Sequence, residues 1–152
     1  MAETTTPEPT TVIVSGYFNP LHIGHLRYLQ AGAAAGDRLI VIVNNDLQQQ
    51  LKKGRVIMSA EDRREIVAAL GMVDEAVIAI DQDPTVVATI ESIAQRETGA
   101  RLVFGNGGDR DSAAEVPEQT VCDRYSIEMV FDMGGTEKAD SSTRINAAMA
   151  SE

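Results

Sequence analysis

The sequence has a single cysteine, Cys122, and two histidines, and these shortages limit the chemistry available to it. One cysteine excludes an internal disulfide and is typical of a protein in a reducing cytoplasm. We interpret Cys122 as a small buried apolar residue. Without a third histidine, a metal shared by His22 and His25 would need carboxylates for its remaining ligands. We therefore predict no metal site in the protein.

Long hydrophobic runs are also missing. No apolar run approaches the roughly 20 residues needed to cross a bilayer. The first residues, MAETTTPEPTT, lack the basic start and apolar stretch of a secretion signal. We expect residues 1–10 to form a disordered tail and residues 11–152 to form one domain. Together these features favour a cytoplasmic protein.

Positive charge is scarce. Thirteen lysines and arginines stand against 23 acidic residues, which gives a net charge of −10. An acidic surface repels nucleic acid and anionic membranes, so we expect neither as a partner. The few cations gather at Lys52, Lys53 and Arg55, in an expected loop, and then at Arg63 and Arg64. This clustering favours a site for a small anionic molecule.

Two common nucleotide-binding motifs are absent. There is no Walker loop, and Gly16 stands without the glycine cluster of a dinucleotide-binding fingerprint. The expected second strand does end in Asn44-Asn45-Asp46, with an acid near the place where that fingerprint has one. Because the glycines are missing, we do not expect a NAD-type site.

What the chain does have is five apolar, β-branched-rich runs that alternate with helical patterns. Such alternation predicts an α/β, Rossmann-like fold: a five-stranded parallel sheet with helices on both faces. We expect the strand order 3-2-1-4-5. The expected strands are 12–15, 39–43, 76–80, 102–104 and 127–131, and the expected helices are 23–35, 60–70, 84–98, 117–125 and 142–150.

Several helix ends carry local signals. Ser59 is a predicted N-cap, and Asp83-Pro84 is predicted to supply an N-cap followed by proline in the first helical position. A left-handed residue is predicted just past three helix ends, at Gly36, Gly71 and Gly99.

The most informative segment is Val12 to Gln30, VIVSGYFNPLHIGHLRYLQ. It predicts a strand, a tight loop and a helix, with His22 and His25 where the helix begins. A helix N-terminus has unpaired N–H groups and partial positive charge, so it can bind a phosphate. Histidines there can donate hydrogen bonds to a charged transition state. Gly24 between them lets a ligand approach the backbone closely.

This segment resembles the HxGH signature of the nucleotidyltransferase superfamily. The similarity runs from about Thr11 to the C-terminus and includes the segments E-D-R at 61–63, G-G-D at 107–109 and S-S-T-R-I at 141–145. The chain looks most like the short members, glycerol-3-phosphate cytidylyltransferase and the heptose-phosphate adenylyltransferase domain. The resemblance implies that an acceptor oxygen attacks the α-phosphorus of a nucleoside triphosphate and that pyrophosphate leaves, with no protein nucleophile.

The resemblance also implies roles for individual residues. His22 and His25 would bind the α-phosphate and the leaving group, while Lys53 would reach the acceptor phosphate. The planar fork of Arg63 could hold a phosphate as the fourth catalytic residue. Expected nucleotide contacts are Gly16, Tyr17, Phe18, Asn19, Gly24, Gly107, Asp109, Ser141, Ser142 and Thr143, and expected acceptor contacts are Lys52, Arg64 and Lys138.

From these residues we predict a cytidylyltransferase that transfers CMP from CTP to a small phosphorylated or phosphonate acceptor. Two alternatives stay open: an adenylyltransferase that uses ATP and a sugar phosphate, and a non-catalytic nucleotide-binding module. We expect Mg²⁺ to arrive with the triphosphate and assign it no protein ligand. The resemblance further implies a homodimer.

Overall fold

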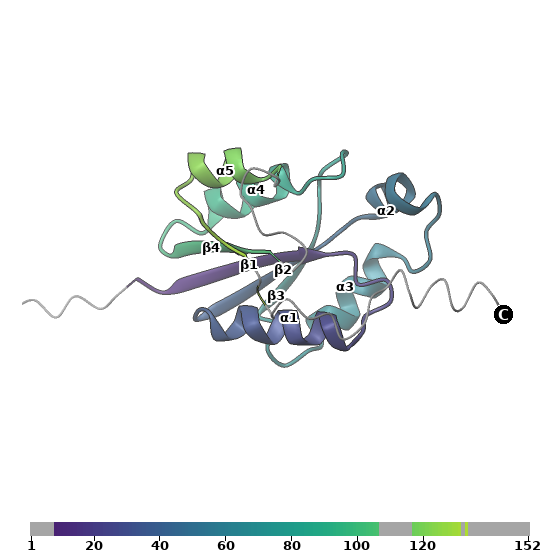
Figure 1. Cartoon of the computed structure of the whole chain (residues 1–152), viewed down its shortest axis with the longest axis horizontal. Coiled ribbons are helices and arrows are strands. Elements are labelled where there is room, and N and C mark those ends of the chain that lie inside the picture. The colour runs from purple at the N-terminus through teal and green to yellow at the C-terminus, as the bar shows by residue number, and fades with distance from the viewer. Residues whose placement is uncertain (1–7, 107–116, 132, 134–152) are drawn as a thin grey trace, which may run out of the picture.

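The computed structural model describes residues 8–106, 117–131 and 133. These residues form a parallel sheet with helices packed on both of its faces (Figure 1). The strands are β1 (Thr10–Gly16), β2 (Arg38–Val43), β3 (Glu75–Ile78), β4 (Arg101–Gly105) and β5 (Glu128–Val130). The helices are α1 (Ile23–Ala34), α2 (Asp46–Lys53), α3 (Ala60–Ala68), α4 (Val87–Arg96) and α5 (Gln119–Arg124). The expected helix 142–150 lies outside the described residues.

The strand order is β3-β2-β1-β4-β5, which confirms the predicted α/β, Rossmann-like topology. From β1 the chain moves outward through β2 and β3, and then crosses back to the other side of β1 to form β4. The crevice where the order reverses therefore lies between the carboxyl ends of β1 and β4. Open sheets of this kind bind ligands at that crevice.

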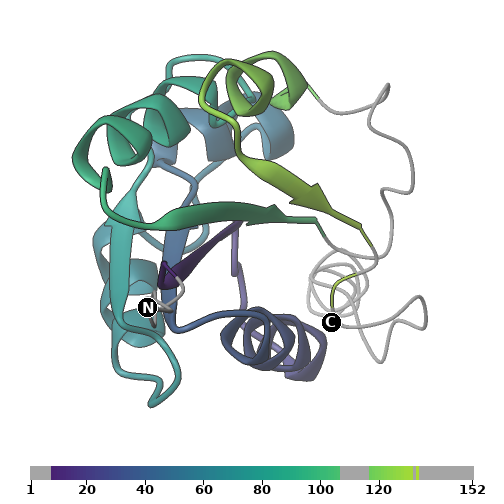
Figure 2. The same ribbon diagram turned by 90° about the vertical axis from the view of Figure 1, so that its left-hand side faces the viewer.

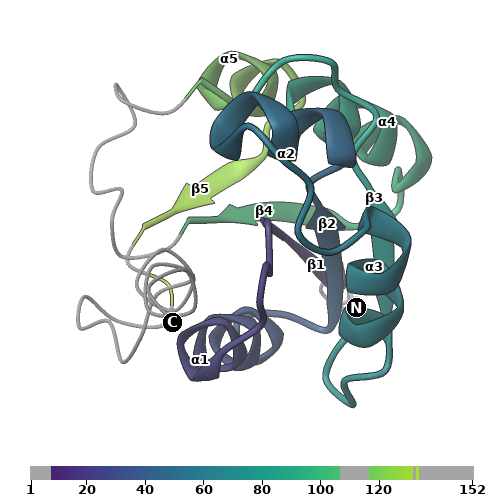
Figure 3. The same ribbon diagram turned by 90° about the vertical axis from the view of Figure 1, so that its right-hand side faces the viewer.

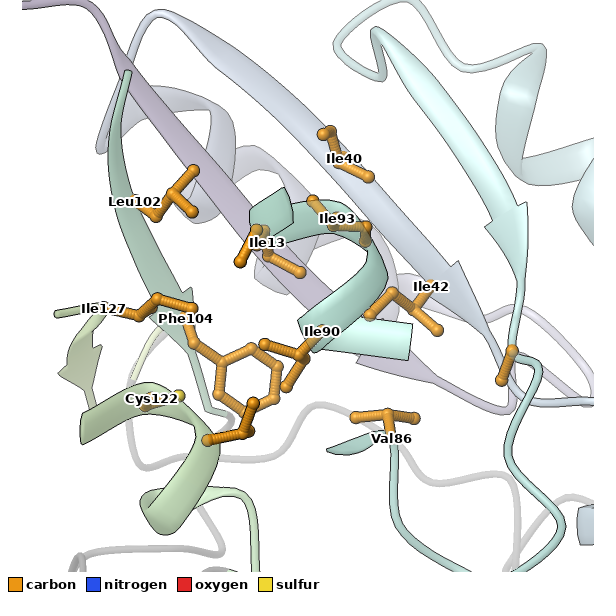
Figure 4. Close-up of a cluster of buried hydrophobic side chains, with 13 residues drawn as sticks. Ile13, Ile40, Ile42, Val86, Ile90, Ile93, Leu102, Phe104, Cys122 and Ile127 are labelled. Atoms are coloured by element: carbon orange, nitrogen blue, oxygen red, sulfur yellow. The ribbon is translucent and has the colours of Figure 1, made fainter. Parts of the chain in front are cut away.

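Both faces of the sheet are buried. Helices α4 and α5 cover one face, and α1 and α3 cover the other (Figure 2, Figure 3). Alternate residues of β1 separate accordingly: Ile13 packs in the α4 and α5 cluster drawn in Figure 4, whereas Val12 and Val14 pack on the opposite side. Cys122 is a buried member of the first cluster, as predicted. Burial on two faces explains the near-continuous apolar runs of the central strands.

One element was not predicted at all. The segment around Lys52 and Lys53 was expected to be a loop, and this is wrong, because both residues lie in the last turn of α2. Asn45 caps this helix by accepting a hydrogen bond from the backbone of Gln48. Gly54 ends it in the left-handed conformation, with φ 76°.

The predictions for helix ends had mixed outcomes. The Ser59 side chain does accept from a backbone N–H at the start of α3, as predicted. The start at Pro84 is wrong: α4 begins at Val87, and Asp83 instead accepts from the backbone and the hydroxyl of Thr85.

The predicted left-handed glycines are wrong as well. Gly54 is the glycine with positive φ among the described residues, and Gly36, Gly71 and Gly99 do not share that conformation. Gly36 meets a different need. A Cβ at this position would lie 2.7 Å from the carbonyl oxygen of Thr10, so a glycine is required for close approach to β1.

No helix within the described residues has the length and apolar character needed to span a bilayer.

Candidate active site

The two histidines form one unit at the N-terminus of α1. His22 is the N-cap, and its Nδ1 accepts from the backbone N–H of Gly24 at 3.1 Å. Nδ1 of His25 in turn accepts from the backbone N–H of His22 at 3.2 Å. The rings stack, with centroids 3.9 Å apart and planes inclined by 25°. Because Nδ1 accepts in each ring, a neutral ring carries its proton on Nε2.

Phe18, in the loop before the histidines, packs in the interior against the ring of His25. This side chain is 1% exposed, and its ring forms a T-shaped contact with the ring of His25, with centroids 5.0 Å apart. Phe18 adopts a positive φ of 51°, which is uncommon for a residue other than glycine. A Cβ at Gly16 would lie 2.8 Å from the Phe18 ring, so the glycine makes room for the ring. Phe18 therefore supports the histidine pair by packing.

Helix α2 lies over the same carboxyl edge of the sheet (Figure 3). Nζ of Lys52 stands 4.4 Å from the centroid of the Tyr17 ring, and the Tyr17 hydroxyl donates to the carbonyl of Gln48 at 3.5 Å. Burial raises the pKa of Tyr17, and the charge of Arg63 opposes that shift in part. The structure thus brings Tyr17 and Lys52 together, although they are far apart in the sequence.

Arg63 is placed differently from the expectation. Its side chain is fully buried, and Nη1 donates to the carbonyls of Tyr17 at 2.9 Å and Asn44 at 2.7 Å. Nε donates to the carbonyl of Met58 at 2.9 Å, and Nη2 donates to Asp46 at 3.1 Å. Burial lowers the pKa of the guanidinium, and the hydrogen bond and charge of Asp46 oppose that shift. These contacts support a role in holding the site together instead of the phosphate contact expected from the resemblance.

Two glutamines that the sequence did not single out fasten helix α2 to neighbouring segments. Gln48 and Gln49, on α2, are both fully buried. Gln48 donates to the carbonyls of Asp83 at 2.8 Å and Thr85 at 2.7 Å, which joins α2 to the segment before α4. Gln49 reaches the loop that carries the histidines, through Asn19. The sequence offered no signal for them, because apolar spacing would have placed Leu47 and Leu51 inward, whereas both leucines are exposed.

The remaining predicted site residues are only partly placed. Arg64 is half-buried on α3, next to Arg63. The backbone of Lys53 ends α2, and its side chain is not among those described. The other expected contacts lie outside the described residues, namely Gly107, Asp109, Lys138, Ser141, Ser142 and Thr143.

A histidine pair on a helix N-terminus, set beside the crevice of a parallel sheet, is an arrangement suited to nucleotidyl transfer. The chain matches the model of the Cytidylyltransferase-like family over residues 13–147, and it belongs to that family. This confirms the predicted resemblance to the HxGH nucleotidyltransferase superfamily.

Relatives with similar sequences include two proteins named FAD synthase. The one from Natrialba magadii is 46% identical over 79 residues, which cover 52% of this chain and 53% of that protein. The one from Pyrococcus abyssi is 46% identical over 68 residues, or 44% of this chain and 46% of that protein. The bifunctional protein HldE of Hydrogenovibrio crunogenus is 43% identical over 75 residues, 48% of this chain and 16% of that protein. The matches thus span about half the length of the FAD synthases.

Solved structures share the fold. The lipopolysaccharide core biosynthesis protein from Thermoplasma volcanium superimposes with a TM-score of 0.66 and 23% identity, covering 87% of this chain and 99% of that one. A putative nicotinate-nucleotide adenylyltransferase from Vibrio parahaemolyticus gives a TM-score of 0.61 with 16% identity, covering 93% and 87%.

Proposed function

We propose that the protein is an adenylyltransferase that transfers AMP from ATP to a small phosphate-bearing acceptor, with FMN as the first acceptor to test. The FAD synthase relatives support this proposal, because FAD consists of FMN joined to AMP. They favour ATP over the CTP that the sequence alone led us to expect. The resemblance of the sequence to the heptose-phosphate adenylyltransferase domain keeps a sugar phosphate as the second acceptor class.

The observation that carries the proposal is the stacked pair His22 and His25 on the α1 N-terminus. In the proposed step, an oxygen of the acceptor phosphate bonds to the α-phosphorus of ATP. The bond from that phosphorus to the bridging oxygen breaks, and pyrophosphate leaves with the electron pair. Negative charge builds on the oxygens around phosphorus, where the Nε2–H groups and the helix N-terminus can stabilise it. No protein nucleophile is needed, since the acceptor supplies the attacking oxygen.

Lys52 is proposed to hold the acceptor phosphate. A flexible ammonium group suits this role, and the Tyr17 ring beneath it limits where that group can reach. Mg²⁺ is treated as part of the ATP substrate, because magnesium keeps water and phosphate ligands. Among the described residues, no three His, Cys, Asp or Glu side chains gather in a group that could hold a metal.

The test measures pyrophosphate release with ATP or CTP, each combined with FMN, a heptose phosphate or glycerol 3-phosphate. We expect release with ATP and FMN, and a loss of about 100- to 1,000-fold in kcat for His25→Ala, since one preorganised donor is removed. Arg27→Ala, an exposed change on the same helix, is the control. Turnover only with CTP would restore the cytidylyltransferase prediction. ATP binding without turnover on any acceptor would instead favour a non-catalytic module.

A further inference from the structure

Gln49 connects α2 to the loop that carries the histidines. Its Oε1 accepts from Nδ2 of Asn19 and from the backbone N–H of Ile57, the latter at 2.9 Å. Its Nε2 donates to the carbonyl of Met58 at 3.1 Å. Gln49 is fully buried, as is Asn19. One side chain therefore joins three segments: helix α2, the loop before α1 and the segment before α3.

The backbone fixes which way the Gln49 amide points. The N–H of Ile57 can only donate, so the atom facing it is Oε1, and the carbonyl of Met58 can only accept, so the atom facing it is Nε2. Oε1 is consequently the atom that Asn19 meets. Asn19 has to donate with Nδ2, and an aspartate at position 19 would place one acceptor against another. This explains why asparagine occupies the position in this chain.

The link reaches the histidines through a short, restrained stretch. Asn19 lies three residues before His22, and its neighbour Phe18 packs against the ring of His25. A displacement of Asn19 would therefore reach the histidine pair through its neighbour Phe18, whose ring contacts that of His25. On the other side, α2 carries Lys52, which we have proposed to hold the acceptor.

We propose that Gln49 is a positioning residue. It fixes the amide of Asn19 and thereby the position of the histidine pair relative to α2. The inference rests on the proposed adenylyl transfer for its kinetic part. A misplacement of about 1 Å is enough to lower a rate by about 100-fold, which is the scale of effect expected from breaking this link.

The test compares three methionine substitutions along α2. Gln49→Met removes the link to the loop. Gln48→Met removes a buried glutamine whose side chain bonds to other segments, so it controls for lost stability. Gln50→Met changes an exposed neighbour and controls for the substitution itself. The chain has two histidines, both in the site, so their ring resonances in NMR spectra report directly on its geometry.

We expect Gln49→Met to shift both ring resonances and to lower kcat about 100-fold, while KM for ATP changes only a few-fold. Gln48→Met and Gln50→Met should leave the ring resonances in place. Should Gln49→Met fail to fold, Asn19→Asp breaks the same hydrogen bond from the loop side and is expected to shift the same resonances. Ring resonances unmoved in both Gln49→Met and Asn19→Asp would overturn the proposal. This readout needs no turnover, so it also separates a failure of the positioning role from a failure of the adenylyl-transfer proposal.

Discussion

Replacing Arg63 by methionine tests how the carboxyl edge of the sheet is held together. The guanidinium donates to the carbonyls of Tyr17, Asn44 and Met58, which belong to the loop after β1, the end of β2 and the segment before α3. Methionine is unbranched and apolar and has no donors, so Arg63→Met removes these bonds while it keeps the apolar contacts of the arginine stem.

The loss of stability expected for Arg63→Met depends on the buried carbonyls that lose their hydrogen-bond donor. A buried carbonyl that loses its donor costs about 1–3 kcal/mol, and three carbonyls are affected. The lower end applies, because methionine also removes the cost of burying a charge and keeps apolar contact in its place. Asp46 adds little, since its side chain is 47% exposed and can be hydrated. We therefore expect Arg63→Met to lower the free energy of unfolding by about 3 kcal/mol.

Urea titration followed by circular dichroism measures this loss. Arg64→Met, the adjacent half-buried position on α3, is the matched control and should change the free energy of unfolding by no more than about 0.5 kcal/mol. A loss below about 1 kcal/mol for Arg63→Met, or one equal to that of the control, would contradict the view that its hydrogen bonds hold the edge together.

Three further predictions concern stability. Gly36→Ala should lower the free energy of unfolding by about 1–3 kcal/mol, because its Cβ would lie 2.7 Å from the Thr10 carbonyl oxygen. Gly71 has open space around it, so Gly71→Ala is the control and should cause no measurable loss in thermal denaturation. Ser59→Ala should cost about 1 kcal/mol by removing the α3 cap, and Ser59→Asp should preserve the cap; equal losses in the same assay would refute this. Burial raises the pKa of the Cys122 thiol to about 12 from an ordinary 9.0, so the unfolded thiol ionises first and stability falls as pH rises between these values. The loss is about 1.4 kcal/mol per pH unit in that window, and Cys122→Ala should lack this component when unfolding is measured at pH 8 and pH 10.

The sheet could be predicted because its signal is local and repeated. The runs at 12–15 and 39–43 are apolar at successive positions, as strands buried on both faces must be. Helix α1 begins at Ile23, where the histidine pair and the apolar spacing placed its start. The site at the reversal of strand order followed from the same reasoning, since parallel strands bring their carboxyl ends to one edge.

The start of α4 was wrong because its cap is not local. Asp81, near the end of β3, accepts from the backbone N–H groups of Ala88 at 2.7 Å and Thr89 at 3.1 Å. Asp81 thus accepts from N–H groups in the first turn of α4, a role that an N-cap residue adjacent to the helix usually has. Asp83 and Pro84 match a helix start in sequence, yet the actual cap depends on how the chain returns from β3.

Helix α2 shows why a site can escape a reading of hydrophobic pattern. Its leucines, Leu47 and Leu51, are 47% and 55% exposed, while Gln48 and Gln49 are fully buried. The surface beneath α2 consists of backbone groups that need both donors and acceptors, such as the N–H of Ile57 and the carbonyls beyond β3. A glutamine amide can supply both at once, and a leucine in its place would leave them unsatisfied. At this edge of the sheet the surface is made of backbone groups, so the match between these groups and the glutamine amides decides which side of α2 faces inward. Apolar spacing alone would have predicted that the leucine side of α2 faces inward, which is the opposite of what the structure shows.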